Sequence, residues 1–179
     1  EAATGVIKYN NGDLQSALTS FNNSTNLAPD VAVYHHFVAG VFAEYQSLSP
    51  SVQERGCMSQ SNLSYDECLA SKRLLSLSAA ITERPLYYDN YTELAKFHYE
   101  RGSYGKVTEY YEKALMLVPR SWIIRNKLAE AYLATGYAGR SVRLLEESVN
   151  ITGDLTTAET YLLLGKAYLH NADVVQAID

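Results

Sequence analysis

The residues best suited to chemistry in this sequence are its two cysteines, Cys57 and Cys68, which are separated by ten residues. A disulfide between them would close a short loop and contribute about 2–3 kcal/mol to stability. We expect this bridge in an oxidising compartment, because it would fix a polar segment that has little else to order it. The alternative is two free thiols. Two cysteines alone do not make a structural zinc site, and no histidine lies at a matching spacing.

The other candidates for chemistry are dispersed along the chain. The four histidines, His35, His36, His98 and His170, do not have the spacing of a metal site. His98 occupies a packing position, so we expect its side chain to be buried or half-buried. We find no Gly-rich phosphate loop, no nucleophile elbow and no Ser/His/Asp arrangement that fits on one surface. We therefore expect no enzyme activity, no metal and no cofactor.

Asparagines provide a further motif, the N-x-Ser/Thr acceptor of N-linked glycans. The motif begins at Asn22, Asn23, Asn62, Asn90 and Asn150. It is short enough to arise by chance, so it favours an exported domain without establishing glycosylation. Asn90 stands at an expected helix start, where asparagine also serves as a cap.

Composition limits the class of protein. The chain has 179 residues, of which 47% are apolar and 20% charged, with a net charge of −5. Such an apolar content argues against disorder, and the acidic balance argues against a nucleic-acid surface. No apolar run approaches the roughly 18 residues needed to span a bilayer, so we expect no membrane insertion by this segment. We expect the chain to start and to stop inside helices, and therefore to be a piece of a longer protein.

Residues 88–121 carry two apolar stripes at helical spacing, one on each side of a break at Gly102. The first stripe consists of Tyr91, Leu94, Ala95 and His98. The second consists of Val107, Tyr111, Ala114 and Leu115, and Pro119 ends it. Two amphipathic helices joined by a tight turn form a helical hairpin. Such a hairpin does not bury both its faces alone, so it needs neighbours of the same kind.

This stretch resembles the tetratricopeptide repeat (TPR) family, whose repeats of about 34 residues place aromatic, Leu-Gly, Gly, Ala and Pro residues at fixed spacing. The matching residues are Tyr91, Leu94, Ala95, Gly102, Tyr111, Ala114 and Pro119. His98 and Val107 replace the usual Tyr and Ala, which affects only local packing. The resemblance implies an all-α, right-handed superhelical solenoid of helical hairpins.

The same frame extends over residues 1–179 as a single TPR-like domain, truncated at both ends. Its full or partial repeats are about 1–30, 31–87, 88–121, 122–157 and 158–179. The repeat over 31–87 is too long for the family, because a polar insertion at 46–65 separates its two helices. In that repeat, either Ala39 or Gly40 takes the small packing position. In the next-to-last repeat, Gly153 replaces the final proline.

The resemblance also implies that the first helices of the hairpins line a concave groove. The residues that we expect to contact a protein or peptide partner there are Lys96, Tyr99, Asn126, Glu130, Leu133, Leu162, Lys166 and Leu169. Their mixture of apolar and charged types suits a polypeptide ligand. Some TPR domains hold a peptide's terminal carboxylate with a Lys–Asn pair on one helix. No repeat here has that pair, so we do not expect carboxylate capture.

Three functions remain open from the sequence. The first is a scaffold that binds a polypeptide partner in the groove. The second is the extracytoplasmic tail of a larger membrane protein, such as a bacterial glycan ligase or polymerase, with the chemistry outside this chain. The third is a structural array that self-associates through exposed ends near Val6 and Ala177. The cysteine pair and the low charge favour an extracytoplasmic location over a cytoplasmic one.

Overall fold

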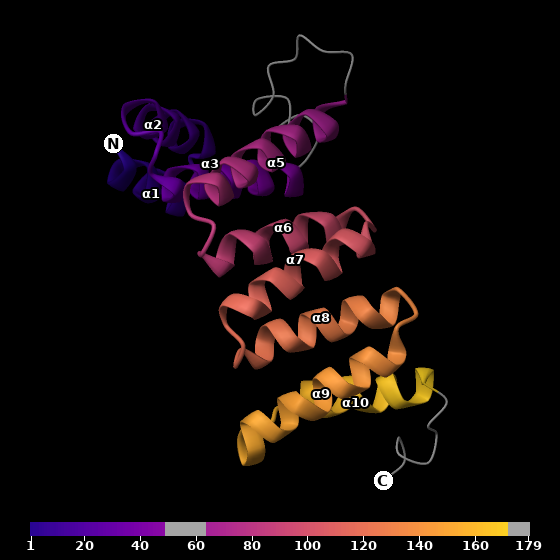
Figure 1. The fold of residues 1–179 in the computed structure, drawn as a ribbon. Helices are drawn as coiled ribbons and strands as arrows, with labels where there is room; N and C mark the ends of the chain where they lie inside the picture. The colour runs from indigo at the N-terminus through magenta and orange to yellow at the C-terminus, as the bar shows by residue number, and fades with distance from the viewer. Residues whose placement is uncertain (49–63, 172–179) are drawn as a thin grey trace. The chain divides into compact units, whose positions relative to one another are not determined.

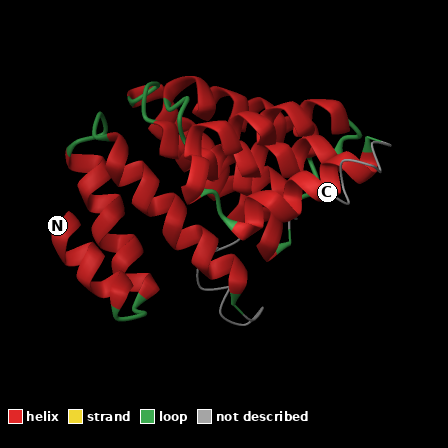
Figure 2. Ribbon diagram, turned by 90° about the horizontal axis from the view of Figure 1, so that it is seen from below, coloured by secondary structure: helices red, strands yellow, loops and turns green. Residues whose placement is uncertain are grey.

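The computed structural model describes residues 1–48 and 64–171, and every regular element in these ranges is a helix (Figures 1 and 2). The all-α prediction is therefore confirmed. The chain divides into two compact units, Glu1–Asn90 and Tyr91–Asp179. A single domain across both units stays a prediction, and most of the expected insertion at 46–65 lies outside the described residues.

The first unit contains α1 (Ala2–Asn10), α2 (Leu14–Leu27), α3 (Ala32–Ser47) and α5 (Tyr65–Glu83). Helix α1 packs on α2, α2 on α3, and α3 on α5, so each helix covers the apolar side of its neighbour. Their shared core includes Phe21, Val41, Tyr45 and Leu69, all buried. Phe42 is also buried there.

Close packing in this unit depends on small residues at one position of each first helix. A methyl group added at Gly5 would lie 2.6 Å from Cε1 of Phe21, so only glycine fits against that ring. In α3 the small position belongs to Ala39, which is buried, whereas nothing lies within 4 Å of a Cβ built at Gly40. The structure thus decides between the two frames that the sequence left open.

Helix α5 begins where a capping box forms. The Ser64 hydroxyl accepts a hydrogen bond from the backbone N–H of Glu67, and the Glu67 carboxylate accepts one from the backbone N–H of Ser64. These two bonds satisfy backbone donors that a helix start otherwise leaves unpaired. The helix therefore starts at Tyr65, at the end of the predicted insertion over 46–65.

The second unit begins within α6 (Tyr88–Glu100) and continues through α7 (Tyr104–Leu117), α8 (Trp122–Ala134), α9 (Ala138–Thr152), the short 3₁₀ helix η1 (Gly153–Leu155) and α10 (Ala158–His170). One core joins α6, α7 and α8 and contains Ala95, Val107, Tyr111 and Leu128. A second core joins α8, α9 and α10 around Leu145. Each helix after α7 thus packs against the next, as expected for stacked hairpins (Figure 1).

Three tight turns depend on glycine. Gly12, Gly102 and Gly136 follow first helices and have φ of 78°, 69° and 79°, a left-handed conformation that is unfavourable for residues with a Cβ. Gly102 was predicted as the break between the two helices of its hairpin. Gly153 also has a positive φ, 54°, and leads into η1 in place of the proline that ends other repeats.

Candidate functional site

The predicted site residues of the second unit lie on α6, α8 and α10, the first helices of successive hairpins. Helix α8 packs directly on α10, and Ala95 of α6 shares a core with Ile124 and Leu128 of α8. Successive first helices are therefore neighbours, which is the arrangement needed to bring residues far apart in sequence onto one surface.

Most of the predicted residues remain accessible after folding. Tyr99, Leu162 and Leu169 are 49%, 63% and 55% exposed, large values for apolar side chains. Lys96 and Lys166 are also exposed, while Glu130 and Leu133 are half-buried. We call these residues the first-helix face: Lys96, Tyr99, Glu130, Leu133, Leu162, Lys166 and Leu169. A concave groove along this face stays a prediction.

Asn126 does not belong to this accessible set. Its side chain is only 2% exposed, and its Nδ2 donates a hydrogen bond of 2.8 Å to Oγ1 of Thr160 on α10. Asn126 was predicted to contact a partner, but its buried amide instead joins two first helices beneath the surface. Its Oδ1 is buried and has no hydrogen-bond partner among the described residues.

Charges on the first-helix face are partly neutralised within their own helices. Lys96 pairs with Glu93, and Glu130 pairs with Lys127 at 3.1 Å, each three residues away on the same helix. Lys166 has no ion pair with any acidic residue in the described part of the chain. Such pairs between exposed residues contribute little to stability, but they decide which charges remain available to a ligand.

Arg125 fixes the start of α8, and the sequence analysis did not identify it. Its Nε and Nη2 donate to the carbonyl oxygen of Pro119 at 3.2 and 2.8 Å, and its Nη1 pairs with Glu147 of α9 at 2.6 Å. The side chain is 9% exposed overall, so these bonds replace most of its hydration. An arginine in place of the aromatic that this position usually carries was the available signal.

Tyrosines of the first helices connect to glutamates of the preceding second helices. The Tyr132 hydroxyl donates to Glu112 of α7 at 2.6 Å, and the Tyr168 hydroxyl donates to Glu146 of α9 at 2.7 Å. Burial, followed by the bond to Glu112, raises the pKa of Tyr132 to about 12. Tyr132 therefore stays protonated near neutral pH, and both hydroxyls serve as structural donors between neighbouring hairpins.

His98 is half-buried, as predicted, and it lies between two aromatic rings. It stacks on Tyr110 with ring centroids 5.5 Å apart and meets the edge of Phe97 at 5.2 Å. Burial is the main cause that lowers the pKa of His98 from its ordinary value, and the nearby Lys106 and Arg101 lower it further while Glu109 opposes them. At neutral pH the ring is therefore an uncharged packing group.

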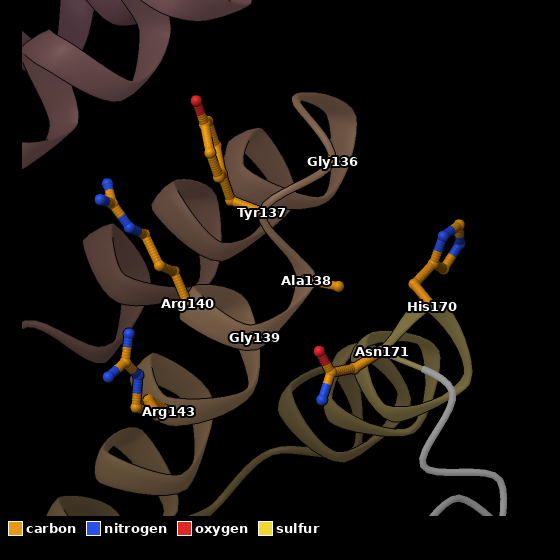
Figure 3. A pocket seen from close by; sticks show the side chains of 8 residues that line it. All are labelled: Gly136, Tyr137, Ala138, Gly139, Arg140, Arg143, His170 and Asn171. Atoms are coloured by element: carbon orange, nitrogen blue, oxygen red, sulfur yellow. The ribbon is translucent and has the colours of Figure 1, made fainter.

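A surface cavity of about 500 Å³ lies near the α8–α9 turn and the end of α10. Figure 3 shows Arg140 and Arg143 pointing to one side of α9, while His170 points away from them at the other end. The Arg140 guanidinium lies over the Tyr137 ring, 5.1 Å from its centroid. The three basic side chains do not converge on one point, so the cavity is not arranged as an anion site.

The remaining sequence candidates have different outcomes. Cys57 lies outside the described residues, so its bridge to Cys68 stays a prediction; Cys68 itself packs at the edge of the first core.

Asn90, one of the predicted glycan acceptors, is 1% exposed. Its side-chain amide donates to the Ala80 carbonyl and contacts His36, which leaves no room for a glycan. Asn22, Asn23 and Asn150 are exposed. Asn62 lies outside the described residues.

The described residues contain neither a membrane-spanning helix nor a cluster of metal ligands. None of the helices in the described ranges combines the length and apolar character needed to cross a membrane. Residues 1–48 and 64–171 contain no group of three His, Cys, Asp or Glu side chains placed to hold a metal ion. Of the two ends that were expected to self-associate, only the first can be described. Val6 packs against the first core, whereas Ala177 lies outside the described residues.

Comparison with solved structures identifies the fold. The chain is similar to the crystal structure of MamA, with a TM-score of 0.74 and 14% identity over 97% of this chain and 88% of that one. It is also similar to YrrB, described as a TPR protein with an unusual peptide-binding site (TM-score 0.73, 11% identity, 98% and 78% covered). PilF of Pseudomonas aeruginosa gives a TM-score of 0.68 with 15% identity, over 98% of this chain and 69% of that one.

The chain therefore has a TPR-like helical repeat fold, as the spacing of residues 88–121 predicted. Neither a protein-family model nor a curated protein matches the sequence. At these identities the likeness concerns the fold alone, because unrelated functions share common folds.

Proposed function

We propose that this TPR-like chain is a protein-interaction scaffold that binds a polypeptide segment on the first-helix face of its second unit. The observation that carries this proposal is the exposure of Tyr99, Leu162 and Leu169 on helices that otherwise pack closely together. Burying such side chains against a partner is favourable. Leu162 and Leu169 are not part of the two cores described for this unit, and Tyr99 meets the edge of the Tyr104 ring of α7 with centroids 5.7 Å apart.

The chemistry of the face suits a polypeptide better than a small molecule. Apolar side chains alternate with Lys96, Glu130 and Lys166 across three helices, which offers both contact area and charges for orientation. YrrB, with a similar fold, is described as having a peptide-binding site, and this supports the proposal. The proposal applies equally to a free scaffold and to the extracytoplasmic tail of a larger membrane protein.

A peptide selection tests the proposal directly. A random peptide library displayed on phage is selected on the immobilised protein, and enriched sequences are synthesised with amidated ends and titrated by fluorescence anisotropy. We expect Tyr99→Ala and Leu162→Ala each to weaken binding by about 1–3 kcal/mol, because apolar anchors near the centre of an interface carry most of its affinity.

The matched control is Met116→Ala on the second helix α7, since Met116 is also a large apolar residue and is 73% exposed. We expect this variant to bind like the wild type, and all three variants to keep the wild-type circular dichroism and melting temperature. Peptides that lose affinity with Met116→Ala but not with the two first-helix variants would place the site elsewhere and refute the proposal.

A further inference from the structure

The exposed side of α10 carries a cation between two leucines. Leu162, Lys166 and Leu169 follow each other at spacings of four and three residues, so they lie on one side of the helix. Both leucines are more than half exposed, at 63% and 55%. A partner that covers the leucines must also cover the ammonium group between them or leave room for its water.

Lys166 differs from the other charged residues of the face in having no partner. Lys96 is paired with Glu93 and Glu130 with Lys127, whereas Lys166 makes no hydrogen bond or ion pair in the described part of the chain. The acidic residue on the same side of α10 is Glu159, seven residues away, which at about 1.5 Å per residue is roughly 10 Å along the axis. That separation is too large for an ion pair.

Among the residues of the first-helix face, the charge left without an ion pair in the described part of the chain is therefore that of Lys166, a cation, although the chain has a net charge of −5. Covering two leucines removes water from the lysine between them, and an ammonium without water needs an acceptor. A carboxylate supplies that acceptor, whereas a partner with a lysine or only apolar residues at this point would leave the Lys166 charge uncompensated.

We propose that the polypeptide bound on the first-helix face carries an internal aspartate or glutamate flanked by apolar residues, with the carboxylate paired to Lys166 and the apolar side chains on Leu162 and Leu169. This inference rests on the proposed function, because it specifies the ligand of the same surface. The carboxylate belongs to a side chain rather than to a chain end, since no helix of the second unit has the Lys–Asn pair expected for terminal carboxylates.

The experiment uses the peptides enriched by phage selection on the whole chain. We expect the amidated peptides to contain an acidic residue next to apolar ones, and Lys166→Gln to weaken their binding about ten- to hundredfold, which is the range of one hydrogen bond to a charged group. A peptide in which the acidic residue is replaced by its amide should bind both proteins equally weakly. Lys166→Glu should favour a peptide with lysine at that position.

Lys96→Gln is the matched control, because Lys96 is an exposed lysine on the same face that already has a partner. It should change the affinity for the acidic peptide less than twofold. Enriched peptides without an acidic residue, an unchanged affinity in Lys166→Gln, or a requirement for a free peptide C-terminus would each overturn the inference. Peptides that are insensitive to Tyr99→Ala and Leu162→Ala would instead refute the proposed function, so the two failures are distinguishable.

Discussion

Asn126 and Tyr99 show why single residues on first helices needed the structure to be assigned. Both occupy positions that the repeat frame leaves for ligands, yet Tyr99 is 49% exposed and Asn126 only 2%. The difference arises because Thr160 of α10 offers a hydroxyl to the Asn126 amide. Helical spacing gives the direction of a side chain but not what the neighbouring helix places opposite it, so this burial could not be predicted from one helix alone.

A substitution of Asn126 tests its role in joining α8 to α10. We expect Asn126→Ala to lower the free energy of unfolding by about 1–3 kcal/mol, because it removes a buried hydrogen bond and leaves a small cavity. Asn150→Ala is the matched control, since Asn150 is an exposed asparagine in α9 of the same unit, and it should change stability by less than about 0.5 kcal/mol. Equal urea midpoints for the two variants would contradict this assignment.

His98 gives the protein a predicted dependence of stability on pH. Because burial lowers its pKa below the ordinary value of 6.5, the unfolded chain binds the proton more readily than the folded one. Stability from this group is complete above pH 6.5 and is lost as pH falls from there through the lowered pKa. His98→Phe keeps a flat ring against Tyr110 and removes the proton site.

Melting temperatures measured between pH 7.5 and pH 5 provide the test. We expect the wild type to lose more stability than His98→Phe as the pH falls across this range. Parallel curves for the two proteins would show that His98 does not titrate differently in the folded and unfolded states.

At the level of helices and turns, the sequence predicted most of the architecture because periodicity and turn residues are local properties. The break at Gly102 was correctly placed, and the two apolar stripes predicted within residues 88–121 lie on α6 and α7. What connects the elements was harder to predict. Arg125 of α8 bonds to Pro119, which lies in the turn before α8, and to Glu147, which lies in α9. Neither partner lies on the helix that carries the arginine.

The turn glycines allow a comparison within the same unit. Gly136→Ala should cost about 1–2 kcal/mol of stability, because φ of 79° is unfavourable for a residue with a Cβ. Gly105→Ala should instead be stabilising by up to about 1 kcal/mol, since Gly105 lies in α7 with nothing within 4 Å of a built Cβ. Both values can be read from urea unfolding. A destabilised Gly105→Ala together with an unchanged Gly136→Ala would show that turn geometry does not control stability here.

At the scale of the whole molecule, the TPR-like fold could be predicted because the spacing of a few small and aromatic residues recurs along the chain. Of the predicted partner-binding residues, the structure leaves Tyr99, Leu162 and Lys166 accessible and buries Asn126. The sequence could not separate these cases, because accessibility depends on which side chains of α8 and α10 meet. The identity of a partner is not a property of the repeat frame at all, which is why selection experiments are needed.

The most direct test of the central claim is an NMR map of peptide binding on the isotopically labelled chain. A peptide enriched by selection is titrated into the protein, and changes in backbone amide shifts are followed residue by residue. If the first-helix face is the binding site, the largest changes will occur in α6, α8 and α10 around Tyr99, Glu130 and Leu169. Changes confined to the second helices α7 and α9 would contradict the account.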